Sequence, residues 1–195
     1  MTTAVSTVRR QASSRKMKAK PQELLVEAQK KLKHAEMLLS VSRKCAAMES
    51  LDEILETLVN MTTTELGAER GSLFLNDGTT GELYSRVAQG NFSREIRILN
   101  TTGVAGAVFT SGKGEVIDDA YNDSRFNHSI DEQTGYHTET IICAPVKTVR
   151  EEIIGVIQVL NKKSGVFTIQ DLSLLEAMGT QASIALQNTQ FAERM

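Results

Sequence analysis

Short polar side chains gather in one segment of this chain, residues 118–140, which reads DDAYNDSRFNHSIDEQTGYHTET. Hydroxyl, amide and carboxylate groups of this kind form hydrogen bonds with sugars and with the edges of bases. Four residues offer such groups: Asn127, Asp131, Thr134 and Thr138. Long loops between strands are uncommon in compact domains and are usually functional, so we expect this one to contact a ligand. The structural alternative is a variable surface loop held together by Tyr121, Phe126 and Tyr136.

A second candidate is the sequence GVAGAVFTSG at residues 103–112. It predicts a short helix over 104–110, with Gly103 before it and Gly112 after it. The first N–H groups of a helix have no partner within the helix. Together with the helix dipole they can hold a phosphate without any Arg or Lys. The alternative is that Gly103 and Gly106 serve close packing alone.

A third candidate is Asn161–Lys162, followed by Phe167 and Asp171. A Lys that leaves a strand can form an ion pair with an Asp in the first turn of the next helix, with Phe167 packed beneath. On a surface such a pair contributes less than roughly 1 kcal/mol. We expect these residues to fix the sheet edge to the last helix and to shape a pocket without touching its ligand.

Signatures of catalysis and of metal binding are absent from the sequence. It has no GxSxG, HExxH, GxxxxGK[ST] or glycine-rich dinucleotide motif. His34, His128 and His137 do not have the spacing of metal ligands. Cys45 and Cys143 form no CxxC, and Cys143 lies in an apolar segment typical of a core strand. We therefore expect a binding domain and not an enzyme, with no catalytic residue, no metal and no cofactor.

Charge is distributed unevenly along the 195 residues, which carry a net formal charge of −2. Residues 1–44 hold 11 Lys and Arg against three Glu, a charge of +8, and the rest of the chain carries −10. Residues 1–20 have no acidic residue, and we expect a disordered basic arm there. Such an arm could contact nucleic acid or an anionic membrane, but a solvated tail is the favoured interpretation.

Length and composition are those of one globular domain with extensions, with 41% apolar and 24% charged residues. The absence of Trp and the 5% of aromatic residues argue against a base-stacking surface for nucleic acids. No apolar run reaches the roughly 20 residues of a membrane span, and the start lacks a secretion signal. Two distant cysteines suit a reducing compartment. We expect a cytoplasmic location.

Hydrophobic periodicity predicts three longer helices. The first covers residues 21–48 and has the a/d spacing of a coiled coil, at Leu25, Ala28, Leu32, Ala35, Leu39, Ser42 and Ala46. Ser50 with Glu53 forms a capping box for the second helix, which Gly67 ends. The third begins near Ile169. The outer two helices have no closing signal, so we expect them to pair two copies of the chain in a homodimer, in preference to merely covering the sheet.

Alternation and turn residues predict six strands, at residues 70–76, 82–88, 94–99, 115–117, 140–148 and 152–160. Short helices are expected at 104–110 and 125–133. The resulting order, α-α-β-β-β-α-β-α-β-β-α, favours an α+β fold. In this fold a mostly antiparallel sheet carries helices on one face and a ligand-sized connection on the other.

Several blocks of the chain, taken in order over about residues 45–190, resemble the GAF domain family. They are EIRI at 95–98, GVAG at 103–106, the DDAY…F…D..TG..T pattern of 118–138, and GVIQVLNK at 155–162. Asn161, Lys162, Phe167 and Asp171 resemble the NKxxF…DE signature of the cyclic-nucleotide-binding GAF domains of phosphodiesterases and bacterial adenylyl cyclases. Leu172 stands where that family usually has Glu.

The resemblance implies a GAF fold for residues 49–190, with the last helix continuing into a downstream region. This fold has a six-stranded antiparallel sheet. The N- and C-terminal helices pack on one face, and a helix–loop ligand lid lies on the other. The implied ligand is a cyclic nucleotide buried beneath the lid.

The resemblance also implies roles for single positions. Four side chains would face the base: Arg70, Ser72, Gln89 and Gln158. Backbone N–H groups for the cyclic phosphate would come from Val104, Ala105 and Asn127, and contacts to ribose or base from Asp131, Thr134 and Thr138. Guanine-binding relatives have Asp where this chain has Gln89, and Arg70 can donate to adenine ring nitrogens. We therefore expect cAMP in preference to cGMP.

The implied function is regulatory: closure of the lid over the nucleotide reorders the terminal helices, which signal to a C-terminal effector domain such as an adenylyl cyclase or a phosphodiesterase. The alternative is a GAF dimerisation scaffold without nucleotide, or a sensor of another small ligand. Leu172 supports the scaffold, as does Ala88, since relatives often have an aromatic residue at that position. A bilin GAF domain would need a lid Cys, which residues 118–140 lack, and a haem GAF domain would need an apolar pocket with a His. A sulfoxide-reductase GAF domain would need several cysteines around the pocket, which Cys143 alone does not supply.

Overall fold

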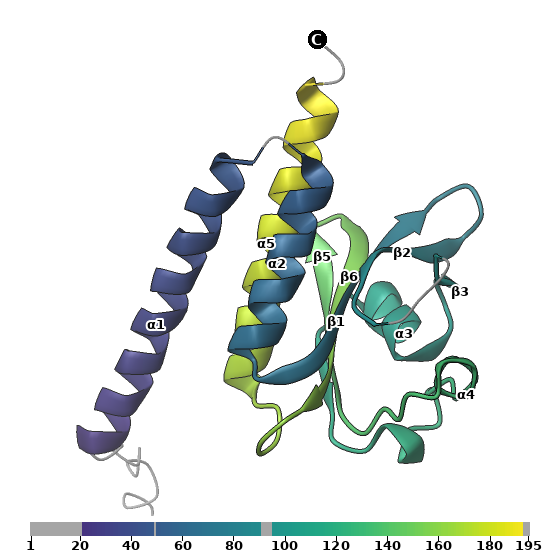
Figure 1. Cartoon of the computed structure of the whole chain (residues 1–195), viewed down its shortest axis with the longest axis horizontal. Helices are drawn as coiled ribbons and strands as arrows, with labels where there is room; N and C mark the ends of the chain where they lie inside the picture. Colours follow the sequence, from purple (N-terminus) through teal and green to yellow (C-terminus); the bar gives the residue numbers. More distant parts are fainter. Residues whose placement is uncertain (1–20, 49, 91–94, 193–195) are drawn as a thin grey trace, which may run out of the picture. The chain divides into compact units, whose positions relative to one another are not determined.

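The computed structural model of the chain describes residues 21–48, 50–90 and 95–192 (Figure 1). The side chains of residues 45, 46 and 190–192 are not described, and the predicted basic arm at 1–20 lies outside the described residues. Contacts divide the chain into two units, residues 1–36 and 37–195. No helix among the described residues combines the length and the apolar character that a bilayer crossing requires.

Helix α1 (Pro21–Ala46) spans the boundary between the two units. Of the predicted coiled-coil positions, Leu25, Leu32 and Leu39 are all more than half exposed. Val41, further along the same helix, is fully buried in the core of the second unit. An exposed leucine stripe is what pairing of two copies requires, and the homodimer stays a prediction.

The second unit is built on one sheet in the order β3-β2-β1-β6-β5-β4, in which every pair is antiparallel. Its strands are β1 (Ala68–Asp77), β2 (Glu82–Ala88), β3 (Arg97–Leu99), β4 (Glu115–Ile117), β5 (Ile141–Lys147) and β6 (Ile153–Lys162). Its helices are α2 (Leu51–Glu65), α3 (Gly103–Ser111), α4 (Ser129–Thr134) and α5 (Ile169–Ala192), with a 3₁₀ turn, η1, at Ala120–Asn122. The predicted α+β class and six antiparallel strands are confirmed.

Each face of the sheet carries its own apolar core. Helices α2 and α5 pack side by side on one face, against β1, β5 and β6 (Figure 1). Alternation places Leu73 and Leu75 of β1 in that core, and Phe74 in the second core on the opposite face, beneath α3. The predicted helices on one face are therefore present, and the second face carries α3.

Local structure departs from the prediction at two helix starts. Ser50 does precede α2, but its side chain makes no capping hydrogen bond, so the predicted capping box is wrong. The helix predicted at 125–133 begins only at Ser129. Before it, the carboxylates of Asp119 and Asp123 and the amide of Asn127 accept hydrogen bonds from backbone N–H groups two or three residues on. These local turns compete with the helix.

One buried hydroxyl has no partner among the described residues: Ser183 on α5, which is 1% exposed. A buried polar group without a hydrogen bond costs about 1–3 kcal/mol. We expect Ser183→Ala to raise the free energy of unfolding by about 1 kcal/mol, measured by urea denaturation. The matched control is Ser173→Ala on the exposed side of the same helix, where a change below about 0.5 kcal/mol is expected. A loss of stability in Ser183→Ala would contradict the assignment.

Candidate functional site

A cavity of about 100 Å³ lies on the face of the sheet opposite α2 and α5. Its floor is formed by β1 and β6, one wall by the start of α3, and its cover by the lid segment, defined as residues 118–138. Every residue predicted to face the ligand lines it: Arg70, Ser72, Gln89, Val104, Ala105, Asn127, Asp131, Thr134, Thr138 and Gln158. The fold thus brings these separate segments together at one place.

The floor presents three polar side chains in a row. Arg70 and Ser72 alternate on β1 toward the cavity, and Gln158 of β6 lies directly opposite Ser72 in the strand register. Within the described part of the chain, the side chains of Ser72 and Gln158 make no hydrogen bond. Their hydroxyl and amide are therefore free to bind a polar ligand.

The start of helix α3 forms the wall. Gly103 has φ +74°, a conformation that favours glycine, and the preceding Thr102 provides no side-chain cap. The first backbone bond into the helix is Gly106 N–H to Thr102 O, so the N–H groups of Val104 and Ala105 have no partner among the described residues. Both residues are 5% exposed. Free N–H groups at the positive end of a helix attract an anion.

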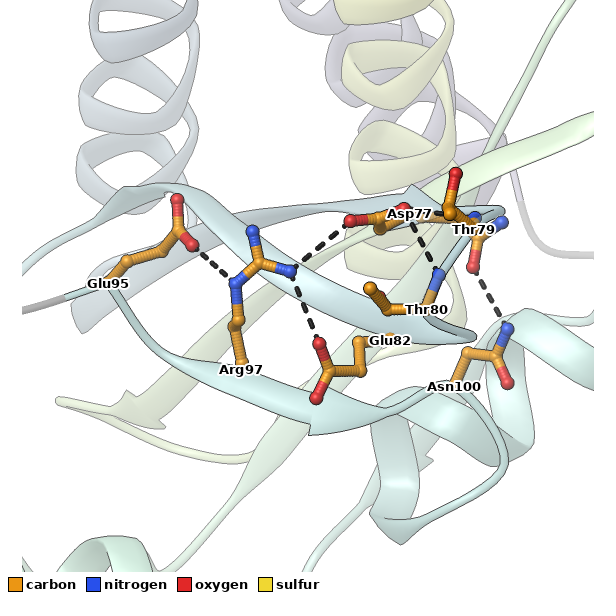
Figure 2. Close-up of polar contacts among 8 residues, drawn as sticks. Asp77, Thr79, Thr80, Glu82, Glu95, Arg97 and Asn100 are labelled. Carbon is orange, nitrogen blue, oxygen red and sulfur yellow. Dashed lines mark hydrogen bonds and ion pairs between the residues drawn. The ribbon is translucent and has the colours of Figure 1, made fainter.

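A polar network positions this wall (Figure 2). The Arg97 side chain bonds to the carboxylates of Asp77 and Glu82, which join β3 to the β1–β2 hairpin, and to Glu95 just before β3 (Figure 2). Three residues further on, the Asn100 amide donates to Asn76 Oδ1 over 2.9 Å. The chain therefore enters α3 from a fixed point at the end of the sheet.

Several polar groups predicted to contact the ligand already have partners inside the protein. Asp131 is 6% exposed, and its carboxylate accepts hydrogen bonds from Thr138 N (2.6 Å), Thr138 Oγ1 (2.8 Å) and Tyr121 Oη (3.2 Å). The Thr134 hydroxyl donates to Ile130 O. The two bonds with Thr138 hold α4 to the end of the lid segment. With three bonds accepted, the Asp131 carboxylate has little free accepting capacity.

Gln89 is also engaged within the protein. Its Oε1 accepts from Gly71 N over 2.7 Å, and its Nε2 donates to Asn60 Oδ1 on α2. The residue lines the cavity as predicted, but its amide connects β1 to α2 on the other face. A ligand would have to compete with these two bonds to recruit it.

The near end of the lid segment is fixed by charge. The Arg125 guanidinium binds the carboxylates of Glu115 on β4 and Asp123, both over 2.7 Å. Hydrogen bonds from Arg125 lower the pKa of Asp123 from 3.8 to about 2. The same two carboxylates raise the pKa of Arg125, so the pair stays ionised at neutral pH.

This ion pair predicts a pH dependence of stability. Because the pKa of Asp123 is lower in the folded chain, its contribution is complete above about pH 4 and is lost as the pH falls towards 2. Arg125 is more than a third exposed, so screening limits the effect to roughly 1 kcal/mol. Urea unfolding at pH 5 and pH 3 should show a steeper loss for wild type than for Asp123→Asn. Equal losses in the two proteins would contradict the assignment.

The far end of the lid segment is fixed by Asn161, which has φ +54° and is 9% exposed. Its Oδ1 accepts from Glu139 N (2.7 Å) and Thr140 N (3.2 Å). Its Nδ2 donates to His137 O (2.8 Å) and Glu69 Oε2 (3.2 Å). The prediction that Asn161 fixes the sheet to the last helix is wrong, because its amide binds the lid exit and the start of β1.

Lys162 makes the expected contact with the last helix. Its Nζ lies 2.8 Å from Asp171 Oδ2 at the start of α5 and 5.2 Å from the ring centroid of Phe167. It also donates to Leu66 O at the end of α2, a contact that the sequence did not predict. Asn161 and Lys162, adjacent in the chain, thus connect the lid exit with both helices of the opposite face.

The sequence prediction missed the apolar lining and one aromatic residue of the cover. The lining also includes Phe74, Ile96, Ile98, Thr102, Gly103, Phe126, Ile130, Tyr136, Ile141 and Leu160. Strand alternation could have found Phe74 and Leu160, since they share a face with Ser72 and Gln158. The cavity is therefore lined mostly by apolar residues with a few polar groups, a composition that small-molecule sites usually have.

The remaining candidate residues show no reactive arrangement. Burial raises the pKa of the Cys143 thiol well above its usual value, as expected of a core residue. His128 and His137 pack against the ring of Tyr121, each with centroids 4.6 Å apart. Among the residues that the structure describes, no group of His, Cys, Asp and Glu has the arrangement of a metal site.

Curated proteins that resemble this chain in sequence include cyclic-nucleotide phosphodiesterases. The chain is 33% identical over 179 residues to a probable 3',5'-cyclic phosphodiesterase of Caenorhabditis elegans, covering 85% of this chain and 24% of that protein. It is 31% identical over 192 residues to the dual 3',5'-cyclic-AMP and -GMP phosphodiesterase 11 of Drosophila melanogaster, covering 90% and 13%. The chain thus spans a quarter or less of the length of these relatives.

Solved structures show the same fold at lower identity. The GAF domain of a phosphoenolpyruvate-protein phosphotransferase from Coxiella burnetii superposes with a TM-score of 0.74 at 17% identity, over 83% of this chain and 97% of that one. Free methionine-R-sulfoxide reductase from Neisseria meningitidis gives 0.70 at 18% identity, over 82% and 91%. The GAF domain family matches residues 50–186, and the chain belongs to this family.

Proposed function

We propose that this GAF domain is a regulatory sensor that binds a cyclic nucleotide in the cavity beneath the lid segment, with cAMP favoured over cGMP. The observation that carries the proposal is the convergence of polar groups from β1, β6, α3 and the lid segment on one apolar cavity. Relatives that are named as cyclic-nucleotide phosphodiesterases support it.

The start of α3 suits the cyclic phosphate. The N–H groups of Val104 and Ala105 face a cavity that contains one cationic side chain, Arg70. A helix N-terminus of this kind binds phosphate through backbone donors and the helix dipole. With the phosphate there, the base would lie toward β1 and β6.

The floor favours adenine. A Gln amide pairs well with the N6 and N7 atoms of adenine, and the Gln158 amide is available for this. Arg70 could donate to ring nitrogens of adenine or to O6 and N7 of guanine, so it does not discriminate alone. Guanine also presents N1–H and N2–H donors that need acceptors. The Asp131 carboxylate and the Gln89 carbonyl are already occupied, which leaves neutral acceptors such as the Gln158 carbonyl and the Ser72 hydroxyl for these donors.

Binding requires the lid segment to move. Ligand pockets are typically about 300–1,000 Å³, and the cavity here is about 100 Å³. The floor is held in the sheet, whereas α4 lies outside the sheet and is bonded to the end of the lid segment through Asp131 and Thr138. The lid segment is therefore the part that yields when a nucleotide enters.

The signal would leave through the helices of the opposite face. Movement at the lid exit reaches Asn161, and the adjacent Lys162 contacts the ends of both α2 and α5. In a longer protein the helices would act on an effector domain. The phosphodiesterase relatives favour a phosphodiesterase effector over an adenylyl cyclase. The homodimer through the terminal helices and the cytoplasmic location belong to the same proposal.

A second candidate function is a dimerisation scaffold that binds no nucleotide. The internal hydrogen bonds of Asp131, Thr134 and Gln89 favour it, because the cavity groups are satisfied without a ligand. The exposed leucines of α1 would then carry the function. Sensing of another small ligand is a further outcome of the same test.

Thermal unfolding of the 195-residue chain with cAMP and with cGMP tests the proposal, after unfolding and refolding to remove any bound ligand. Ligand at about 100 times its dissociation constant adds roughly 2.7 kcal/mol of stability, which raises the midpoint by about 5–10 °C for a chain of this size. A larger shift with cAMP than with cGMP is expected. The reverse order would contradict the adenine preference, and no shift with either would favour the scaffold.

A further inference from the structure

The lid segment is joined to the start of β1 by a single aromatic side chain, Tyr136. Its hydroxyl donates to Glu69 Oε2 over 2.8 Å, and its ring lies beneath the guanidinium of Arg70, with Arg70 Cζ 3.7 Å from the ring centroid. Glu69 and Arg70 are adjacent on β1, so the tyrosine contacts both at once. The first residue is exposed and the second lines the cavity.

The geometry of this contact restricts Arg70. A guanidinium whose Cζ lies 3.7 Å over an aromatic ring is attracted by the ring electrons, which restricts its rotation. Its N–H groups lie at the edge of the plane, so the stack leaves them available to a ligand. Arg70 is thus oriented by a residue of the lid segment and not by its own strand.

Charge and burial keep the contact intact at neutral pH. Partial burial and the bond to Glu69 raise the pKa of the Tyr136 phenol, so the hydroxyl stays protonated and remains a donor. The hydrogen bonds from Tyr136 and then from Asn161 lower the pKa of Glu69, so its carboxylate stays ionised and remains an acceptor. Asn161 also holds the lid exit, which places Glu69 at the centre of both attachments.

We propose that Tyr136 is a latch that fastens the lid segment to Glu69 and, through its ring, orients Arg70 toward the ligand only while the lid is closed. The second part of this inference rests on the proposed nucleotide site, and the first does not. Tyr136 is a positioning residue: it acts on the ligand through Arg70. Opening the lid removes the ring from Arg70, so recognition by this cation is linked to closure.

Hydrogen exchange of the 195-residue chain without nucleotide tests the latch. The amides of Thr138, Glu139 and Thr140 bond to Asp131 or Asn161 and report opening of the lid exit. We expect their exchange to rise about tenfold in Tyr136→Leu, which loses ring and hydroxyl. About threefold is expected in Tyr136→Phe, which loses only the hydrogen bond to Glu69. At least the same rise is expected in Glu69→Gln, which removes the charge that faces both Tyr136 and Asn161.

The matched control is Tyr84→Phe on β2, where Arg97 also lies over a tyrosine ring, at 5.3 Å. Its hydroxyl makes no hydrogen bond among the described residues, so unchanged exchange at the three lid amides is expected. Unchanged exchange in Tyr136→Phe and Tyr136→Leu would overturn the latch. The conservative Phe and Gln variants keep the test decisive if Tyr136→Leu does not fold.

Titration with cAMP tests the link to Arg70. Tyr136→Leu and Arg70→Gln are each expected to weaken binding, and the double variant should bind no more weakly than Arg70→Gln alone. Tyr136→Phe, which keeps the stack, should retain most of the affinity. Additive losses in the double variant would overturn the orienting role. If no variant, nor the wild type, binds cAMP or cGMP, the proposed function fails, whereas the exchange result still decides the latch.

Discussion

The Asn161→Ala variant is expected to lose about 3 kcal/mol of unfolding free energy and most of its affinity for a cyclic nucleotide. The buried amide of Asn161 accepts hydrogen bonds from the backbone N–H groups of Glu139 and Thr140 and donates one to the carbonyl of His137. Each buried backbone group left without a partner costs about 1–3 kcal/mol. The lid exit would also separate from Glu69. Urea denaturation and cAMP titration of the same samples measure both effects.

Asn161→Gly separates the hydrogen bonds from the backbone strain. At φ +54° an alanine costs about 1 kcal/mol more than a glycine, because its Cβ approaches the following carbonyl. The glycine variant should therefore be about 1 kcal/mol more stable than Asn161→Ala and still well below wild type. An Asn161→Ala protein within 1 kcal/mol of wild type would show that the amide does not hold the lid.

Replacement of Gly155 by alanine is expected to destabilise the chain by more than 3 kcal/mol. A Cβ at this position of β6 would overlap the carbonyl oxygen of Phe74 and would lie 3.1 Å from Leu75 Cα. Both are backbone atoms of β1, held in the central strand pair of the sheet. Overpacking of a core commonly costs 1–3 kcal/mol and more where the neighbour cannot move. The thermal midpoint should fall by more than 6 °C.

Gly78→Ala is the matched control for this substitution. Gly78 lies in the β1–β2 turn, and a Cβ there would meet no atom within 4 Å. Replacing a glycine by alanine at an unstrained site lowers the conformational entropy of the unfolded chain and stabilises the folded protein by about 0.4–1 kcal/mol. Equal melting of Gly155→Ala and wild type would mean that β1 and β6 can separate locally, which conflicts with a rigid cavity floor.

The positions of the strands and of the pocket face could be predicted from the sequence because both depend on local periodicity. Alternation along β1 and β6 sets Arg70, Ser72 and Gln158 on one face before any tertiary contact is known. The boundary glycine Gly67, with φ +59°, also ends α2 where expected. The pairing of these strands into one six-stranded antiparallel sheet was then predicted from the resemblance to a known family.

The partners of the polar residues could not be predicted in the same way. Asp131 and Thr138 were expected to face a ligand, and in the structure they bond to each other. Asn161 was expected to help Lys162 fix the sheet to the last helix. In the structure Lys162 contacts that helix, whereas Asn161 bonds to His137 at the lid exit. Which of several neighbours a short polar side chain bonds to depends on differences of a few tenths of an ångström in the fold, which periodicity does not encode.

The lid segment shows the same limit for secondary structure. The sequence analysis predicted a helix from residue 125, but Asx turns at Asp123 and Asn127 use the backbone N–H groups that such a helix would need. Tyr136 was assigned to holding the loop together, and only the structure shows its contact with Arg70 and Glu69. Loops are specified by particular side-chain bonds more than by pattern.

Calorimetric titration of cAMP and cGMP into the ligand-free 195-residue chain, beside Arg70→Gln, tests cyclic-nucleotide sensing most directly. We predict one cAMP per chain, weaker binding of cGMP, and cAMP affinity at least about tenfold lower in Arg70→Gln, since one charged hydrogen bond contributes about 1.5–3 kcal/mol. Absence of binding of either nucleotide to the wild-type chain at millimolar concentration, with the protein folded by its thermal transition, would contradict it.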